Sequence, residues 1–224
     1  MSKIENFEQK IILNGMTDED FIEYEKLLKR VRSNFSKRQH CYTTAIQFPC
    51  EHADQAVKLI QYGLENFEDA WFSTYTSYLY IGHIYEKIGN YPKAFEAYLS
   101  AKAALNPEQQ GYAEELSKEL LWMKLHIDSF QYSKELEDYF LCYEKTDAFS
   151  KSFINSEFRL TVAGIVIALH YRKNDEAKQL LEKAKQICQP NYTGKLNKLL
   201  TKHQYQDSFN ETPESIAFIQ NIKI

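Results

Sequence analysis

Apolar residues recur at steps of three and four along most of the chain, which is the period of a helix with one buried face. The pattern is clearest in 77–88, at Tyr78, Ile81, Ile84, Tyr85 and Ile88. The same period predicts helices over 17–35, 36–48, 51–67, 93–105, 108–127, 156–171 and 176–188, one that begins near 133, and short ones within 1–16, 194–204 and 212–222. Segments rich in β-forming residues are absent. The sequence therefore predicts an all-α protein.

Turn signals predict that neighbouring helices form antiparallel hairpins. Gly89 and Asn90 tolerate the left-handed conformation that ends a helix, and Pro92 suits the first turn of the next one. Gly82 lies inside the apolar pattern of the first helix, where a glycine costs about 1 kcal/mol relative to alanine. A glycine at such a position predicts the close approach of another helix. We therefore expect the two helices of this hairpin to pack tightly.

The residues of this hairpin follow an ordered alternation of large and small side chains. The positions that carry it are Tyr78, Ile81, Gly82, Tyr85, Ala94, Tyr98, Ala101 and Pro107. The segment from Trp71 to Pro107 thereby resembles a tetratricopeptide (TPR) repeat, in which a bulky residue, a Leu-Gly-like pair and Tyr precede Ala, an aromatic residue, Ala and Pro. Pro107 lies one residue later than the family usually has it. The alternative interpretation is any helical hairpin with small residues at its interface.

Weaker copies of the hairpin precede and follow it. Ala56 lies 38 residues before Ala94, and an offset of 41 residues aligns 91–98 with 132–139. A further copy follows near twice that offset. Glu135 stands where Ala94 stands, and a carboxylate fits poorly at a close helix contact. Periods near 38, 41 and 42 exceed the 34 residues of a TPR repeat, which longer helices or a broader α-solenoid would explain.

We predict an all-α fold in which antiparallel helical hairpins stack into a right-handed, TPR-like superhelix. About four hairpins plus terminal helices make up the chain, which satisfies the minimum of about three repeats for a stable stack. The predicted organisation is an N-terminal helical lead-in at 1–35, a TPR-like repeat array at 36–190, and a C-terminal capping helix and tail at 191–224.

Composition and charge narrow the possible functions. Hydrophobic residues make up 44% of the 224 positions, and the net charge of −4 gives no general attraction to nucleic acid. No run of about 18 apolar residues exists, so we expect no membrane span. The N-terminal stretch lacks the features of a signal peptide. The four cysteines have no framework spacing, which favours a reducing compartment. We therefore expect a cytoplasmic protein.

No motif indicates catalysis, a cofactor or a metal. Zinc sites use four N or S ligands at tight spacing, which His40-Cys41 and Cys50-Glu51-His52 do not provide. Phosphate loops, the GxSxG elbow and the HExxH motif are absent. A Cys–His catalytic pair has no signature here and stays open as an alternative. We predict no cofactor, no metal and no catalytic residue.

Positive charge gathers at Lys26, Lys29, Arg30, Arg32, Lys37, Arg38 and His40. We interpret this run as a solvated face with charges at a helix end, where the helix dipole favours cations. A patch for nucleic acid or an acidic partner is the alternative. Tyr75 and Tyr80 fall off the main apolar face of their helix. Exposed tyrosines are good contact residues, because they bury much area with little loss of entropy.

The TPR resemblance implies a binding groove. In that family the first helix of each hairpin lines a concave groove that usually holds a peptide or a partner's helix. Carried over with the offset of 41, the groove-facing positions are Thr76, Leu79, His83, Glu86, Ser117, Leu120, Lys124 and Ile127. These side chains mix apolar and charged groups, as a peptide groove does, and His83 and Lys124 are suited to hold a carboxylate.

The leading hypothesis is a non-enzymatic module that binds another protein or a peptide in this groove. The first alternative is a helical regulator or immunity-type inhibitor that masks one partner through an acidic, aromatic surface. The second alternative, from another class, is a hydrolase or transferase whose active site has no sequence signature.

Overall fold

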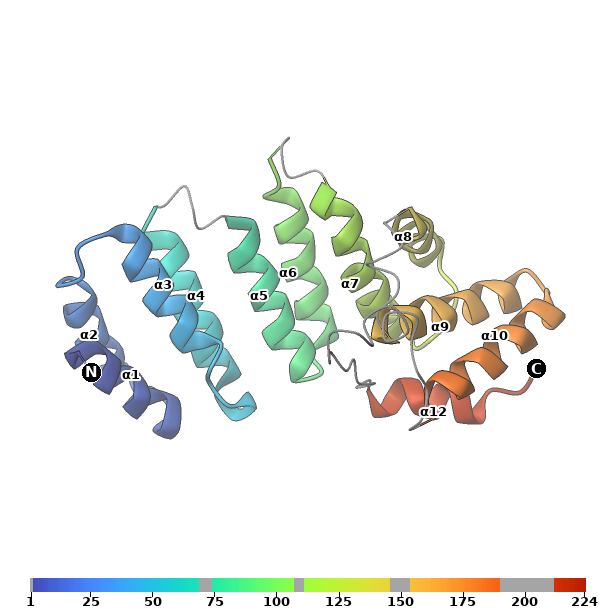
Figure 1. Cartoon of the computed structure of the whole chain (residues 1–224), viewed down its shortest axis with the longest axis horizontal. Helices are drawn as coiled ribbons and strands as arrows, with labels where there is room; N and C mark the ends of the chain where they lie inside the picture. The colour runs from blue at the N-terminus through green and yellow to red at the C-terminus, as the bar shows by residue number, and fades with distance from the viewer. Residues whose placement is uncertain (1, 69–73, 107–110, 146–153, 190–211) are drawn as a thin grey trace, which may run out of the picture. The chain divides into compact units, whose positions relative to one another are not determined.

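The structure, a computed structural model, describes residues 2–68, 74–106, 111–145, 154–189 and 212–224 (Figure 1). Every regular element in these ranges is a helix and none is a strand, which confirms the all-α prediction. The chain divides into two compact units, Met1–Asn106 (unit 1) and Pro107–Ile224 (unit 2). The division at 106/107 falls inside the predicted 36–190 array rather than at its ends.

Unit 1 contains two hairpins preceded by two further helices (Figure 1). Its elements are α1 (Lys3–Asn14), α2 (Asp18–Leu28), α3 (Asn34–Ala45), the short 3-10 helix η1 (Cys50–His52), α4 (Ala53–Asn66), α5 (Thr74–Lys87) and α6 (Tyr91–Ala103). Helix α3 pairs with α4 and α5 pairs with α6, while α4 also packs against α5. The hairpins predicted around 36–67 and 77–105 are therefore present.

Unit 2 contains two more hairpins. Its elements are α7 (Gly111–Ile127), α8 (Lys134–Glu144), α9 (Ile154–His170), α10 (Asn174–Ile187) and α12 (Pro213–Asn221). Helix α7 pairs with α8, α9 pairs with α10, and α9 also contacts α7 and α8. The C-terminal helix α12 packs against α10, and its Phe218 ring stacks on Phe130 with centroids 4.8 Å apart. The helix predicted at 194–204 lies outside the described residues.

Side-chain caps set where several helices begin. Thr17 accepts a hydrogen bond from the Asp20 backbone N–H, and the Asp20 carboxylate accepts from the Thr17 backbone N–H, which makes a reciprocal capping box at the start of α2. The predicted helix over 17–35 is wrong at its other end, because α2 stops at Leu28. Ser33 then caps α3 by accepting from the Ser36 backbone N–H at 3.0 Å. The boundary predicted between the helices over 17–35 and 36–48 therefore lies earlier in the chain, between Leu28 and Asn34.

The α5–α6 hairpin shows the close contact expected at Gly82. A Cβ atom there would overlap the ring of Tyr98, which is fully buried. Gly89 has φ +73°, and the Asn90 side chain caps α6 by accepting from the Lys93 backbone N–H. Because Gly82 has no side chain, the Tyr98 ring of α6 packs directly against α5.

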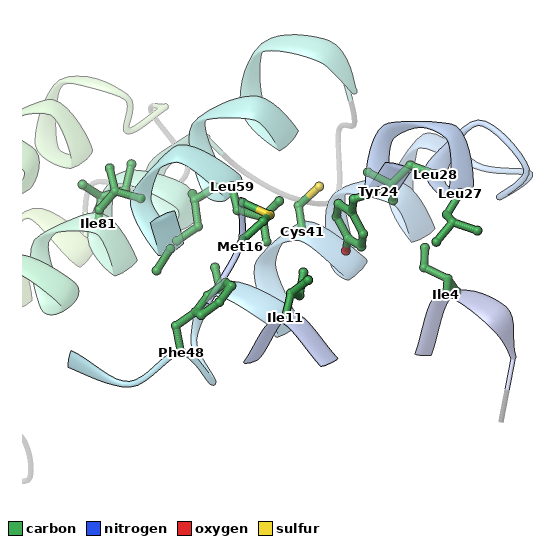
Figure 2. Close-up of a cluster of buried hydrophobic side chains, with 14 of the residues drawn as sticks. Ile4, Ile11, Met16, Tyr24, Leu27, Leu28, Cys41, Phe48, Leu59 and Ile81 are labelled. Carbon is green, nitrogen blue, oxygen red and sulfur yellow. The ribbon is translucent and has the colours of Figure 1, made fainter. Parts of the chain in front are cut away.

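Each unit has its own hydrophobic core. In unit 1 the core includes the fully buried Ile11, Tyr24, Leu28 and Leu59 (Figure 2). In unit 2 the fully buried side chains include Leu116, Leu120, Leu121, Trp122, Met123, Phe158, Val162 and Ile165. The last three of these lie on α9, which is therefore a central helix of this core.

Candidate binding site on helices α3 and α5

A row of three ring side chains runs across the first helices of the two hairpins in unit 1. Tyr42 of α3 and Tyr80 of α5 meet edge to face, with ring centroids 4.5 Å apart. The His83 ring lies 5.6 Å from Tyr80 and 5.7 Å from the buried Tyr98. Edge-to-face pairs are favoured by the ring quadrupoles, so the contacts hold the rings in position. Tyr42 and Tyr80 are half-buried and His83 is exposed, so this aromatic row presents part of its surface to solvent.

Burial also shifts the pKa of one phenol in the aromatic row. The pKa of the Tyr42 phenol is raised, first by burial and then by hydrogen bonding with Tyr80. Both effects favour the neutral phenol of Tyr42. Tyr80 is one of the two tyrosines that the sequence pattern placed off the main apolar face of this helix.

A buried polar contact joins α3 to α5 beneath this row. The Arg38 guanidinium donates through Nη2 to the Ser77 hydroxyl at 3.2 Å, and both residues are buried. Arg38 was grouped with the basic run, but it lies in the interior of unit 1. His40 also leaves that run, because its Nδ1 pairs with the Glu8 carboxylate at 2.9 Å. These two positions therefore do not contribute to a basic surface patch.

An apolar hollow of about 40 Å³ opens between the C-terminal ends of α3 and α5. It is lined by Ala45, Ile46, Phe48, Pro49, Cys50, Ala53, Ala56, Ile84, Lys87 and Ile88. Ile46 is 45% exposed and Ile88 is 38% exposed, although both are large apolar residues. The hollow therefore reaches the surface, with apolar side chains at its opening.

The hollow and the aromatic row form one continuous face. Ile46 lies four residues after Tyr42, and Ile84 lies four residues after Tyr80. Residues four apart on a helix are neighbours on the same side. We call this surface, made by Tyr42, Tyr80, His83 and the lining residues of the hollow, the α3–α5 face. Of the described residues that line the hollow, only Lys87 is ionic, and it is exposed.

The four groove residues predicted in unit 1 lie on or beside this face. His83 belongs to the aromatic row, and Thr76 and Leu79 are half-buried on the same helix. Glu86 accepts a hydrogen bond from the Tyr98 hydroxyl at 2.6 Å. This contact joins α5 to α6, so Glu86 has a structural role within the hairpin.

The four groove residues predicted in unit 2 have different surroundings. Ser117 and Leu120 are fully buried, so they present no surface to a partner, which corrects the expectation for these two positions. Ser117 donates to the Ala113 carbonyl at 3.0 Å and lies 2.9 Å from the Cys142 sulfur. Ile127 is 38% exposed. Two of the four groove residues predicted in unit 2 therefore lie in its interior.

Lys124 is held by two carboxylates within unit 2. Its ammonium group lies 3.2 Å from Asp128 and 3.0 Å from Glu135. The contact explains how a carboxylate is tolerated where the better copy of the repeat has Ala94, since Glu135 is exposed and paired rather than buried. With both neighbours acidic, Lys124 is a poor anchor for a further carboxylate.

Sequence reasoning missed Tyr42, Ile46, Lys87 and Ile88 as site residues. The spacing of Ile88 fits the apolar face of α5, so it was counted with the core. Its exposure follows from the end of α5 at Lys87, one residue earlier. The only sequence signal for the hollow is the apolar pair Ile46 and Phe48 directly before Pro49, where a helix must end.

A second polar cluster in unit 1 is buried rather than exposed. The Glu8 carboxylate accepts a hydrogen bond from the Tyr24 hydroxyl at 2.7 Å and pairs with His40. The Glu8 hydrogen bond raises the pKa of His40, so the charged imidazole is favoured at this position. The three residues come from α1, α2 and α3 and fasten these helices to one another.

The cysteine beside this cluster does not have the properties of a nucleophile. Burial raises the pKa of the Cys41 thiol to about 12, which keeps it protonated. Within the residues that the structure describes, no three His, Cys, Asp or Glu side chains converge as metal ligands. In the same ranges, no helix has the length and apolar character to cross a membrane.

Comparisons of this chain with protein-family models, with curated proteins and with solved structures found no match.

Proposed function

We propose that the chain is a binding module that takes a segment of another protein, or a peptide, on the α3–α5 face. The observation that carries the proposal is the apolar hollow, which opens beside a partly exposed aromatic row on the first helices of two adjacent hairpins. Concave apolar sites with a few placed polar groups are where ligands bind most often. Aromatic side chains next to such a hollow are the residues that most often dominate binding energy.

The binding energy in this proposal comes from few side chains. Burying one aliphatic side chain stabilises a complex by about 1.5–3 kcal/mol. Ile46 and Ile88 add apolar area at the opening, and Tyr42 and Tyr80 add aromatic area one helical turn away. Such a contact suits a short anchored segment, whose affinity depends on the anchor rather than on total area.

A peptide selection tests the proposal. Random peptides displayed on phage are selected on the immobilised protein, and the affinity of enriched peptides is measured by fluorescence anisotropy. We expect Ile46→Asp and Ile88→Asp to weaken binding by about tenfold or more, because each places a charge against the apolar anchor. Ile22→Asp on α2 is the matched control, since Ile22 is 52% exposed and lies outside the hollow.

The control variant should keep the affinity of the wild-type protein within about twofold, as expected for a surface change remote from the contact. Absence of any enriched peptide, or equal weakening by all three variants, would contradict the proposal.

A second candidate is a regulator that masks one partner through an acidic, aromatic surface, and one feature of unit 2 favours it. Tyr132 and Tyr171 both donate hydroxyl hydrogen bonds to the Glu137 carboxylate, at 2.9 and 3.2 Å. The Tyr132 ring also stacks on His170, and Tyr171 is 49% exposed. If enriched peptides lose affinity with Tyr171→Ala and not with Ile46→Asp, this second surface is the binding site.

A further inference from the structure

We infer that the ligand of the α3–α5 face is an acidic segment, with one aliphatic side chain in the hollow and a nearby carboxylate at Lys87. The inference rests on the proposed function and adds the chemistry of the ligand. It follows from two properties of the hollow, its size and its charge.

The size of the hollow fits one branched aliphatic side chain. The hollow has a volume of about 40 Å³, and a single water needs about 10–15 Å³, so the space is large enough for about three waters. Ile46, Ile84 and Ile88 surround this space, and none of them offers a hydrogen bond to a polar side chain. Large aromatic rings exceed the space, and polar side chains would lose their hydrogen bonds to water in it. Valine, leucine or isoleucine is therefore the expected anchor.

The charge at the hollow favours an acidic residue next to that anchor in the ligand. Among the described residues that line it, Lys87 is the only charged one, and it makes no ion pair with any described residue. Some other lysines of unit 1 are paired: Lys10 lies 2.7 Å from Asp20 and Lys58 lies 3.3 Å from Asp18.

Three acidic residues adjoin lining residues in the sequence, and none of them is among the described lining residues of the hollow; one, Glu86, accepts the Tyr98 hydrogen bond. Glu51 and Asp54 are neighbours of lining residues in the sequence, but they are exposed and do not line the hollow. A carboxylate in the ligand gains an ion pair with Lys87, whereas a cationic ligand is repelled. The positive charge of Lys87 therefore favours Asp or Glu close to the anchor.

A charge-reversal selection tests the inference. The random phage-displayed library is selected in parallel on the wild-type protein, on Lys87→Glu and on Lys29→Glu. Lys29 is a matched control because both lysines are exposed and both lie at the C-terminal end of a helix, α2 or α5. Both substitutions therefore place an acid against the helix dipole, and only one changes the hollow.

We expect wild-type and Lys29→Glu proteins to enrich peptides with an aliphatic residue and Asp or Glu within four positions of it. Lys87→Glu should enrich Lys or Arg there instead, and it should bind wild-type-selected peptides roughly three- to tenfold more weakly. Peptides that depend on Ile46 but show no acidic preference, or none that changes with Lys87→Glu, overturn the inference and leave the proposed function intact. Absence of any peptide that depends on Ile46 overturns both.

Discussion

At the scale of single residues, the contact at Gly82 makes a specific prediction about stability. A mid-helix Gly→Ala change normally stabilises a helix by up to about 1 kcal/mol. At Gly82 the new methyl group overlaps the Tyr98 ring, which is fully buried and cannot move away freely. We expect Gly82→Ala to lower the free energy of unfolding by about 1–3 kcal/mol, the usual cost of overpacking. Urea denaturation followed by circular dichroism measures it.

Gly164 provides the matched control for this change. It also lies inside a helix, but a Cβ atom there meets only the end of the flexible Leu180 side chain, at 3.1 Å. Gly164→Ala should therefore be neutral or slightly stabilising. Equal effects at the two glycines would show that Gly82 is not required by close helix packing.

His126 predicts how stability depends on pH. Burial lowers the pKa of His126 from 6.5 to about 4, so the folded state favours the neutral ring. A lowered histidine pKa contributes stability above pH 6.5, and this contribution is lost as the pH falls towards 4. We expect a loss on the order of 2 kcal/mol over this range from this residue. Urea denaturation at several pH values measures it.

The variant that tests this contribution is His126→Phe, which keeps a ring beside Trp122 and Phe130. It should lose less stability than the wild-type protein between pH 6.5 and 4. His170→Gln, which removes an exposed imidazole, controls for the loss of one histidine. If His126→Phe and the wild-type protein lose the same stability on acidification, the buried ring is not the source.

Single residues also show what the sequence could predict and what it could not. Gly82 carried its own signal, because a glycine in an apolar helical pattern is costly unless something packs on it. Ile46 and Ile88 carried no such signal, because their exposure depends on where α3 and α5 end and on how they pair. The hollow is a tertiary feature, and helical periodicity describes one helix at a time.

At the scale of elements, helix starts were predictable where a side chain caps them. Thr17 closes a reciprocal capping box at α2, so removing its hydroxyl exposes the first backbone N–H groups. We expect Thr17→Ala to lower the free energy of unfolding by about 1 kcal/mol, whereas Thr17→Ser keeps the acceptor and most of the stability. Equal loss in both variants, measured by urea denaturation, would argue that methyl packing rather than capping matters.

The end of α2 shows why the remaining boundaries were harder. No glycine or proline occurs between Leu28 and Ser33, so nothing in the local sequence marks a stop. The chain instead tightens after Leu28, where Arg30 and Val31 donate backbone hydrogen bonds three residues back, to Leu27 and Leu28. Ser33 then starts a new helix through its cap. A propensity pattern extends across such a break, because both sides are helical.

At the scale of the whole molecule, the periods predicted one repeat array, and the chain divides into two compact units. In an array each repeat contacts only its neighbours, so stability is close to a sum over repeats. The core of unit 1 runs from Ile4 to Ala97 and joins residues of α1 to α6 in one cluster, so we expect these helices to fold as one unit. Truncation between hairpins should therefore have very different effects at different positions.

We expect a fragment of residues 1–106 to fold cooperatively, because it keeps the entire cluster. A fragment of residues 1–67 loses Ile81 and Ala97 from that core, together with the α5 side of the hollow, and should unfold. Thermal denaturation followed by circular dichroism compares the two. In a simple array, the stability of the two fragments would be in proportion to their hairpins, with no sharp loss at 1–67. Cooperative melting of 1–67 would therefore favour the array over a compact unit, and would separate the fold of α1–α4 from the site that α5 completes.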